Sequence, residues 1–384
     1  MAALTGIRVI EFCEIAAGPF SAMLLADMGA EVIKVERPAG DAMRMWPPIN
    51  DGYSENFASI NRSKKSVVLD LKTPEGVKNA RDLILSADVV VENFRPGVMA
   101  RNGLDYTTMS AVKPELVYCS ISAFGQTGPR SREGGFDLTM QAMAGVMSVT
   151  GEAGGTPVKC GVPLCDFVSA LYGAMGVNAA LVERARTGKG QNVDVAMLGA
   201  TLAIAALQTS EYFGTGNNPK KLGSAHPRNA PYQAFEAKDG HFGMAAGNNN
   251  LWHLVCDVVM RDDLKEHPDY ANPSLRAANQ LALKTILEDV FRTKPVAHWL
   301  TVFAEKGVPS SPINSYADAL TDRQVEHMGW VQDLTLPNGV STKSFGPALR
   351  INDQAGTIAA PPPELGQHTQ EVLSELALRK EPLE

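Results

Sequence analysis

The sequence predicts an α/β protein with a mostly parallel sheet and a second, smaller domain, on the basis of three observations. Strand-like and helix-like segments alternate through the first half of the 384 residues. After a break rich in Gly, Asn, Pro and Lys, the pattern changes to a hairpin followed by helices. Hydrophobic residues make up 45% and charged residues 20%, as in a globular protein long enough for two domains.

The elements of the first half follow one another along the chain. Strands are expected at residues 7–12, 32–36, 66–70, 88–93, 116–121 and 192–197. Helices are expected at 21–29, ending at a glycine, at 74–86, with proline in the first turn, in a long segment after Pro163, and through about Tyr212. Such an alternation places helices on both faces of the sheet, and ligands bind at the carboxyl ends of its strands.

The second half predicts a linker at 214–231 and a small α+β domain at 232–307. That domain is expected to hold a hairpin, 232–235 and 240–245, and helices at 251–260, 274–291 and 297–306. Residues 308–312 and the region after Gly329 are interpreted as a return to the large domain. The large domain would thus combine residues 1–213 and 308–384, with a last helix at 369–378.

Charge and cysteine usage exclude several classes of function. A net charge of −7 argues against non-specific binding to nucleic acid or to an anionic membrane. The apolar stretch 162–181 contains Asp166, Asn178 and several small residues, which favours a packed core helix over a membrane span. The start of the chain predicts a strand and not a signal peptide. Five cysteines without a CxxC pair, and histidines without metal-ligand spacing, indicate reduced thiols, no metal site and a cytoplasmic protein.

Asp166 is the sharpest chemical candidate, because it opens an otherwise apolar helix. The helix dipole stabilises a carboxylate there by ~0.3–1 kcal/mol, so the residue is expected to remain ionised and to be a possible nucleophile. The alternative is an aspartate that only caps the helix, as Asp137 is also expected to do before its own helical stretch. Asp137 could instead shift the titration of Asp166. Cys165 is a rival nucleophile without a helper histidine nearby in sequence.

Basic residues recur near the expected strand ends, at Arg37, Lys72 and Arg101. Together with the pair Asn93-Phe94 they suit a phosphorylated ligand with a purine, although any one basic residue alone is better explained as surface charge. The loop 14–19 lacks the GxGxxG pattern, which disfavours a nicotinamide dehydrogenase. His226, in the long loop, is a further candidate for the border of the site.

Several short motifs occur in order along nearly the whole chain. They are Ala17-Gly18-Pro19, Leu24-Leu25-Ala26-Asp27-Met28-Gly29-Ala30, Val32-Ile33-Lys34-Val35-Glu36, Asn61-Arg62-Ser63-Lys64-Lys65-Ser66, Leu69-Asp70-Leu71-Lys72, Val91-Glu92-Asn93-Phe94-Arg95-Pro96-Gly97, Thr187-Gly188-Lys189-Gly190-Gln191 and Leu365-Gly366-Gln367-His368-Thr369. With these motifs the chain resembles the family III CoA-transferases (CaiB/BaiF), which include formyl-CoA transferase and carnitine CoA-transferase, and the related α-methylacyl-CoA racemases.

The resemblance implies a fold and a set of roles. It implies a homodimer of two interlocked, ring-like chains, each with a Rossmann-like large domain and a small domain. It implies that Asp166 is the catalytic aspartate and that Asp137 matches an active-site glutamate of the formyl-transferring branch. It also implies contacts with coenzyme A, made by the turn Ile15–Ala17 (including Ile15 and Ala17) and by Arg37, Leu69, Lys72, Asn93, Phe94 and Arg101.

Two departures from the family pattern narrow the substrate. Phe136 stands where the racemases have a proton-transferring histidine, and a phenyl ring cannot exchange a proton. Ala16 stands where the formyl and oxalate enzymes have glutamine, which argues against those acids. Gly247 is a candidate for holding the oxyanion.

The resemblance and these departures predict a transferase that moves coenzyme A from an acyl-CoA, such as succinyl-CoA, to a small carboxylic acid through a covalent aspartyl intermediate. Coenzyme A would be a substrate and not a permanently bound cofactor. The alternatives are an acyl-CoA racemase or epimerase and a catalytically silent CoA-binding protein.

Overall fold

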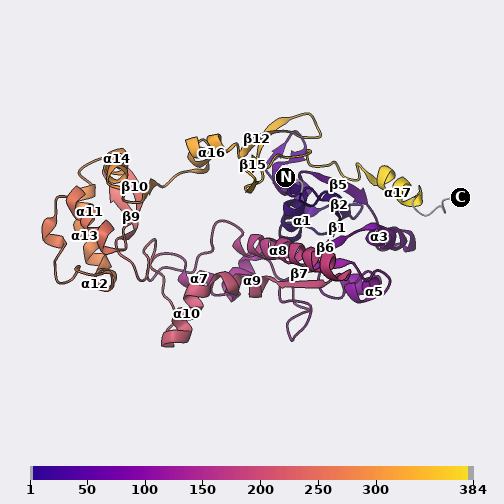
Figure 1. Ribbon diagram of the computed structural model, residues 1–384, viewed down its shortest axis with the longest axis horizontal. Helices are drawn as coiled ribbons and strands as arrows, with labels where there is room; N and C mark the ends of the chain where they lie inside the picture. Colours follow the sequence, from indigo (N-terminus) through magenta and orange to yellow (C-terminus); the bar gives the residue numbers. More distant parts are fainter. Residues whose placement is uncertain (1–2, 379–384) are drawn as a thin grey trace. The chain divides into compact units, whose positions relative to one another are not determined.

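The computed structural model describes residues 3–378, and the outer ends of the expected large domain, residues 1–2 and 379–384, lie outside the described residues (Figure 1). The chain forms two compact units. The first contains the described residues up to 146 together with 159–216 and those from 323 onward. The second contains Met147–Val158 and Asn217–Asp322.

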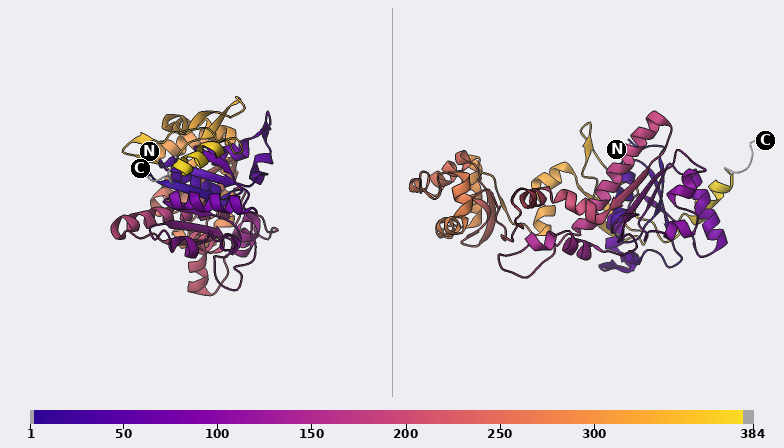
Figure 2. Two further views of the ribbon diagram at one scale, coloured as in Figure 1. Left: turned by 90° about the vertical axis from the view of Figure 1, so that its right-hand side faces the viewer. Right: turned by 90° about the horizontal axis from the view of Figure 1, so that it is seen from below.

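The first unit is built on a six-stranded parallel sheet with the strand order β5-β2-β1-β6-β7-β8. The strands are β1 (Arg8–Phe12), β2 (Glu31–Glu36), β5 (Lys64–Val68), β6 (Val89–Glu92), β7 (Val117–Ser122) and β8 (Asn192–Ala196). This is the order of the doubly wound Rossmann fold, in which the chain leaves the first strand in one direction and later continues in the other. The switch point therefore lies between β1 and β6 (Figure 2). All six expected strands are confirmed, with bounds shifted by one or two residues.

Two apolar cores lie on opposite faces of this sheet. On one face, alternate residues of the strands, such as Val9 and Val91, pack against α1 (Ala17–Asp27), α8 (Leu164–Thr187) and α9 (Met197–Ile204). On the other face, Ile10 and Val90 pack with α3 (Pro74–Ser86) and α17 (Thr369–Leu378). Apolar strand residues therefore pack on both sides of the sheet, and the strands also carry buried charged side chains such as Glu11 and Lys34.

Helix α8 is long and apolar enough to pass a length and composition test for a membrane span. It instead packs on the sheet, and its small residues explain how. A Cβ atom at Gly173 would lie 2.8 Å from Ser21 Oγ of α1, and one at Gly176 would lie 2.6 Å from Val193 Cγ1 of β8. The helix ends at Gly188, whose φ of 73° provides the left-handed cap, with its N–H donated to Arg184. The expected core helix is confirmed.

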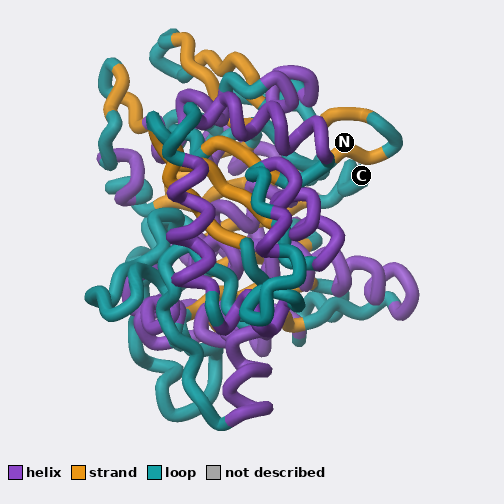
Figure 3. The backbone as a smooth tube through the Cα atoms, turned by 90° about the vertical axis from the view of Figure 1, so that its left-hand side faces the viewer, coloured by secondary structure: helices purple, strands orange, loops and turns teal. Residues whose placement is uncertain are grey.

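The second unit is an α+β unit with the sheet order β11-β10-β9. Its elements are β9 (Tyr232–Ala237), β10 (Gly240–Ala245), α11 (Asn249–Val258), α12 (Pro273–Ala278), α13 (Gln280–Phe291), α14 (Val296–Lys306), β11 (Ser310–Pro312) and α15 (Tyr316–Leu320), with 3-10 turn η2 (Asp262–Leu264). An aromatic core including Trp252, Phe291 and Phe303 holds it together. The hairpin is confirmed, and residues 217–231 form no helix or strand. Figure 3 distinguishes the helices and strands of the chain from its loops and turns, which are teal.

The sequence misplaced part of the boundary between the two units. Residues 308–312 were expected to return to the large domain, but β11 pairs with β10, so the return comes at Arg323. The segment Met147–Val158 also groups with the second unit, although it precedes the linker by some sixty residues of chain. The expected single helix 274–291 is two helices, α12 and α13, which meet at Asn279.

Shorter elements complete the first unit. They are η1 (Ala42–Met45), β3 (Ile49–Asn50), β4 (Tyr53–Ser54), α2 (Glu55–Asn61), α4 (Val98–Arg101), α5 (Tyr106–Ser110), α6 (Asp137–Met143), α10 (Ala206–Thr215), α16 (Arg323–Met328), β12 (Val331–Thr335), β13 (Ser341–Phe345), β14 (Arg350–Ile351) and β15 (Gln354–Ala355). Helix α7 (Val146–Val149) lies at the first boundary between the units.

Candidate active site

A cavity of about 300 Å³ opens at the carboxyl ends of β1, β6, β7 and β8 in the first unit. Its wall comes from the loop after each of these strands and from the start of α8. The lining residues are Glu14, Ile15, Ala16, Ala17, Asn93, Phe94, Arg95, Pro96, Ile121, Ser122, Ala123, Glu133, Gly134, Gly135, Phe136, Asp166 and Met197. The cavity thus occupies the switch point of the sheet, where the doubly wound fold leaves a crevice between diverging loops.

Asp166 lies in the first turn of α8 with a half-buried carboxylate that borders this cavity. Within residues 3–378 no donor is hydrogen-bonded to its oxygens, so it does not cap its helix. Burial, and secondarily the charge of Asp137, raises the pKa of Asp166 to about 7. The expectation of a fully ionised carboxylate is therefore wrong at neutral pH, because loss of water outweighs the helix dipole.

Asp137 performs the capping instead, but on the neighbouring helix. Its Oδ1 accepts a hydrogen bond of 2.9 Å from the N–H of Cys165, in the first turn of α8. Its Oδ2 accepts one of 2.8 Å from Gln141, whose own oxygen accepts the N–H of Cys160. Asp137 does not line the cavity but fixes the start of the helix that carries Asp166.

Cys165 fails as a rival nucleophile. Its side chain is buried in the core below the first turn of α8. Burial raises the pKa of this thiol to about 11, so it carries no thiolate at neutral pH. Asp166, and not Cys165, is thus the side chain that the helix start presents to the cavity.

Four buried charged side chains hold the loop after β1 from beneath. Lys34 Nζ lies 3.0 Å from Glu11 and 2.9 Å from Asp41, and Lys64 Nζ lies 2.8 Å from Glu11, with all these side chains fully buried. Burial alone would lower the pKa of Lys34, but the surrounding carboxylates raise it above its usual value. This buried ion network is electrically balanced, which is the condition under which buried charges are tolerated.

The network also binds backbone atoms at three points, two in the loop and one in the first turn of α1. Lys34 donates to the carbonyl of Cys13 (2.7 Å), Lys64 to the carbonyl of Pro19 (2.8 Å), and Asp41 accepts the N–H of Ile15 (3.2 Å). Ile15 has a φ of 69°, which is unfavourable for a β-branched residue and persists only where its surroundings impose it. The network therefore imposes the shape of the loop that forms one wall of the cavity.

Asn93, from the loop after β6, provides a fourth attachment. Its Oδ1 accepts the N–H of Glu14 at 3.0 Å, and its Nδ2 donates to the carbonyl of Glu14 at 2.9 Å. Both halves of the side-chain amide are thus occupied within the protein, although the residue borders the cavity. Asn93 joins the two loops on either side of the switch point.

The structure brings together most of the residues suggested by sequence. Seven of them line the cavity with each other, namely Ile15, Ala16, Ala17, Asn93, Phe94, Phe136 and Asp166. Arg101 borders an adjoining pocket of about 710 Å³. Arg37 is paired with Glu14 at 3.2 Å, while Leu69 and Lys72 follow the end of β5 along the same edge of the sheet. Leu69 is buried, with 5% of its surface exposed.

Two candidates lie in the second unit, and any part they take beside Asp166 stays a prediction. The Nδ1 of His226 accepts the backbone N–H of Asn229 at 3.0 Å, and its ring packs on Tyr232 with centroids 5.1 Å apart. At Gly247 a Cβ atom would lie 2.7 Å from that of Asn229, so close packing already accounts for a glycine there.

Sequence reasoning missed several residues of the site. Arg95 lies within the motif Val91–Gly97, but the family resemblance implies a role only for Asn93 and Phe94 there. Arg132 lies in none of the motifs. Both border the pocket that contains Arg101. Asp41 carried no signal, because its link to the loop depends on the pairing of β1 with β2.

The fold and the site together define a class of protein. It is a doubly wound α/β protein without a glycine-rich dinucleotide loop, and at its switch point lies a carboxylate that has no partner among the described residues. The sequence model of CoA-transferase family III matches residues 4–369. The chain therefore belongs to CoA-transferase family III and is a CoA-transferase.

Similar proteins agree with this assignment. The succinyl-CoA:glutarate CoA-transferase of Mus musculus is 39% identical over 378 residues, covering 98% of this chain and 87% of the mouse protein. The succinate–glutarate CoA-transferase of Agrobacterium fabrum is 37% identical over 381 residues, covering 97% and 95%. A CAIB/BAIF family protein from Brucella suis has a solved structure with a TM-score of 0.87 at 37% identity, covering 98% of this chain and 99% of that one.

The buried ion network predicts a large effect of removing one of its members. Lys34→Met leaves Glu11 and Asp41 buried without their shared cation, which should lower the free energy of unfolding by about 3–5 kcal/mol. Chemical denaturation followed by circular dichroism measures this. Lys78→Met, which removes an exposed lysine paired with Asp82, should change it by less than about 0.5 kcal/mol. Equal effects of the two substitutions would contradict the role of the network.

Proposed function

We propose that the protein transfers coenzyme A from succinyl-CoA to a second dicarboxylic acid such as glutarate, with Asp166 as the nucleophile. The observation that carries this proposal is the half-buried Asp166 carboxylate bordering the switch-point cavity without a hydrogen-bond partner among the described residues. The relatives named for succinyl-CoA and glutarate support the choice of acids.

The reaction runs in four balanced steps. Asp166 attacks the thioester carbonyl of the donor, the C–S bond breaks, and an aspartyl anhydride and the CoA thiolate result. The thiolate then attacks the aspartyl carbonyl, releasing the donor acid and leaving an aspartyl-CoA thioester. The acceptor carboxylate attacks that thioester, its C–S bond breaks, and a second anhydride and the CoA thiolate result. The thiolate finally attacks the acceptor's acyl carbonyl in this anhydride, and the Asp166 carboxylate leaves. The products are the new thioester and free Asp166.

The surroundings of Asp166 suit these steps. Loss of water leaves the carboxylate more nucleophilic, and a pKa of about 7 keeps a substantial ionised fraction at neutral pH. Helix α1 begins at Ala17 on the cavity wall, and the N–H groups of Ala17 and Gly18 in its first turn have no acceptors within the helix. These groups are our candidates for holding the oxyanion of each tetrahedral intermediate.

Phe136 weighs against the racemase alternative. It lies on the cavity wall at the position next to Asp137, and its side chain is 67% exposed. A two-base proton transfer needs a titratable group on each side of the substrate, and a phenyl ring supplies none. The site is therefore suited to acyl transfer.

Trapping the covalent intermediate tests the mechanism. Incubation with succinyl-CoA followed by hydroxylamine or borohydride should modify Asp166 alone, as mapped by peptide mass spectrometry. Asp166→Asn should lower kcat by at least about 1,000-fold, because it removes the nucleophile but keeps the shape of the side chain. Retained CoA binding in this variant, measured by calorimetry, separates loss of chemistry from loss of folding. Modification at any other residue would refute the scheme.

The dependence of activity on pH tests the environment of the same carboxylate. Because its pKa is raised to about 7, kcat/KM for the acyl-CoA should fall as the pH drops through 7 and the carboxylate becomes protonated. Asp137→Asn removes the like charge yet keeps an oxygen for the N–H of Cys165, so the midpoint of this acid limb should move to lower pH. An unmoved midpoint would exclude Asp137 as a cause.

We further propose that the protein is a homodimer. Helices α8, α9 and α10 of the first unit expose large apolar side chains, which are Leu171, Met175, Val182, Leu202, Ile204, Leu207 and Phe213. An exposed apolar surface of this kind is typical of a protein interface. Light scattering should give twice the chain mass of 41.1 kDa at micromolar concentration, and a monomer would contradict the proposal.

A further inference from the structure

Arg95 is the one cation among the described residues that line the cavity beside Asp166. The cavity's two other acids have partners, since Glu14 is paired with Arg37 and Glu133 with Arg130. The guanidinium of Arg95 forms no ion pair or hydrogen bond with any residue between 3 and 378. It lies across Gly134, where a Cβ atom would be 2.9 Å from Nη2, so the absence of a side chain there makes room for it.

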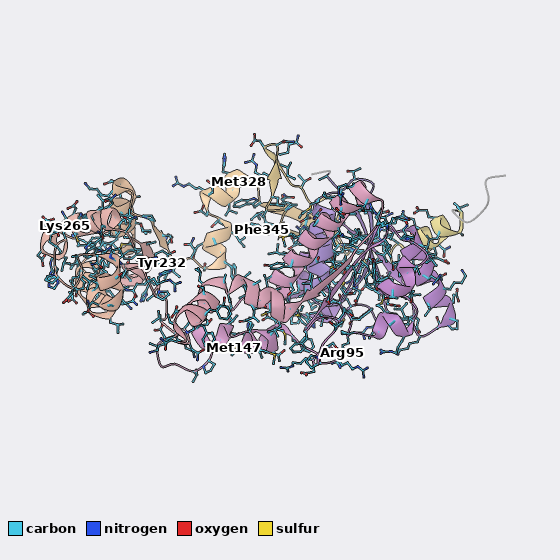
Figure 4. The ribbon with its side chains drawn as sticks, turned by 60° about the horizontal axis from the view of Figure 1, so that its bottom comes forward. Arg95, Met147, Tyr232, Lys265, Met328 and Phe345 are labelled. Atoms are coloured by element: carbon cyan, nitrogen blue, oxygen red, sulfur yellow. The ribbon has the colours of Figure 1, made fainter. Side chains whose placement is uncertain are left out.

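Arg95 also belongs to a wider positive region at the edge of the first unit, where it is labelled in Figure 4. The adjoining pocket of about 710 Å³ is lined by Arg95, Arg101 and Arg132, and it meets the Asp166 cavity at Arg95 and Pro96. No carboxylate in the described part of the chain pairs with any of the three guanidiniums. In a protein with a net charge of −7, such a local cluster indicates a site for an anion.

The anion could come from either of two sources, a phosphate of coenzyme A or a carboxylate of the acid. The three arginines differ in position, because Arg101 and Arg132 border only the outer pocket whereas Arg95 also faces the Asp166 cavity. A guanidinium binds a carboxylate through two parallel hydrogen bonds, a geometry that also fixes the direction of the bound acid. Apolar side chains of Ile121 and Met197 complete the wall and suit a short methylene chain.

We propose that Arg95 binds the non-reacting carboxylate of a dicarboxylic acid, while the carboxyl at the other end of that acid reacts at Asp166. This inference rests on the proposed function and deepens it, because it assigns the selection of dicarboxylic acids to one residue. Asp166 and the incoming acid are both anions, and the guanidinium offsets their repulsion. A monocarboxylic acid lacks the group that Arg95 would hold.

Equilibrium binding of glutarate and of pentanoate, the monocarboxylic acid of equal length, tests the proposal by calorimetry. Arg95→Met should weaken glutarate binding at least about 10-fold, because a charge-assisted hydrogen-bonded pair is lost. It should leave the Kd values of pentanoate and of coenzyme A within about threefold. Arg95→Lys should fall between the wild type and Arg95→Met, since lysine keeps the charge but not the paired donors.

Arg132→Met is the matched control, because it removes a guanidinium from the adjoining pocket but none from the Asp166 cavity. The affinity of Arg132→Met for glutarate is expected to stay within about threefold of wild type. An equal loss of glutarate affinity in Arg95→Met and Arg132→Met would mean that the positive charge of the whole region attracts the anion, which would overturn the proposal. Loss of coenzyme A binding in Arg95→Met would identify a phosphate ligand, which also overturns it.

The two proposals can fail separately. A wild-type protein that binds glutarate through Arg95 but does not transfer coenzyme A would refute the proposed function and leave the binding role intact. A wild-type protein that transfers coenzyme A but binds glutarate and pentanoate with equal affinity would refute the role of Arg95 and leave the proposed function intact.

Discussion

The buried ion network beneath the loop after β1 is the constraint on which the rest of the site depends. Burying Glu11, Lys34, Asp41 and Lys64 together is tolerable only because each charge faces an opposite one. The members of the network come from β1, β2, β5 and the segment after β2. The pairing of these strands therefore determines the shape of the loop after β1. An isoleucine at positive φ is stable there only under such constraint.

Two opposed effects set the reactivity of Asp166. The start of α8 favours the anion, while loss of water and the nearby Asp137 disfavour it, and the second pair prevails. Asp137 has two roles, because its carboxylate both fixes the start of α8 and raises the pKa of Asp166. Position and ionisation of the proposed nucleophile are therefore coupled through one side chain.

The fold was predictable where local chemistry repeats itself along the chain. Helix 74–86 was predicted to the residue, because Thr73 caps its start and Pro74 occupies its first position. The family assignment was likewise accessible, because its motifs are contiguous. The pairing of β11 with β10 was not predictable, because a strand of three residues has too short a pattern to show which sheet it joins.

The sequence predicted which residues line the site better than it predicted their ionisation and contacts. The sequence and its family resemblance identified seven residues of the cavity wall, but the raised pKa of Asp166 depends on burial and on a neighbour 29 positions earlier in the chain. Arg95 was overlooked because surface arginines are common, and its significance lies in the absence of a described partner. Asp41 was overlooked because only the folded sheet brings it to Ile15.

The loop after β1 is constrained in a way that has a consequence for the volume of the cavity. Four hydrogen bonds attach the backbone of the loop and of the first turn of α1 to side chains that belong to other segments. Ala16 has a different constraint, because its side chain borders the cavity and is also packed against buried residues such as Met23 and Phe57. A larger residue at this position would have to find its room on the cavity side, so the size of residue 16 and the volume left for a ligand are linked.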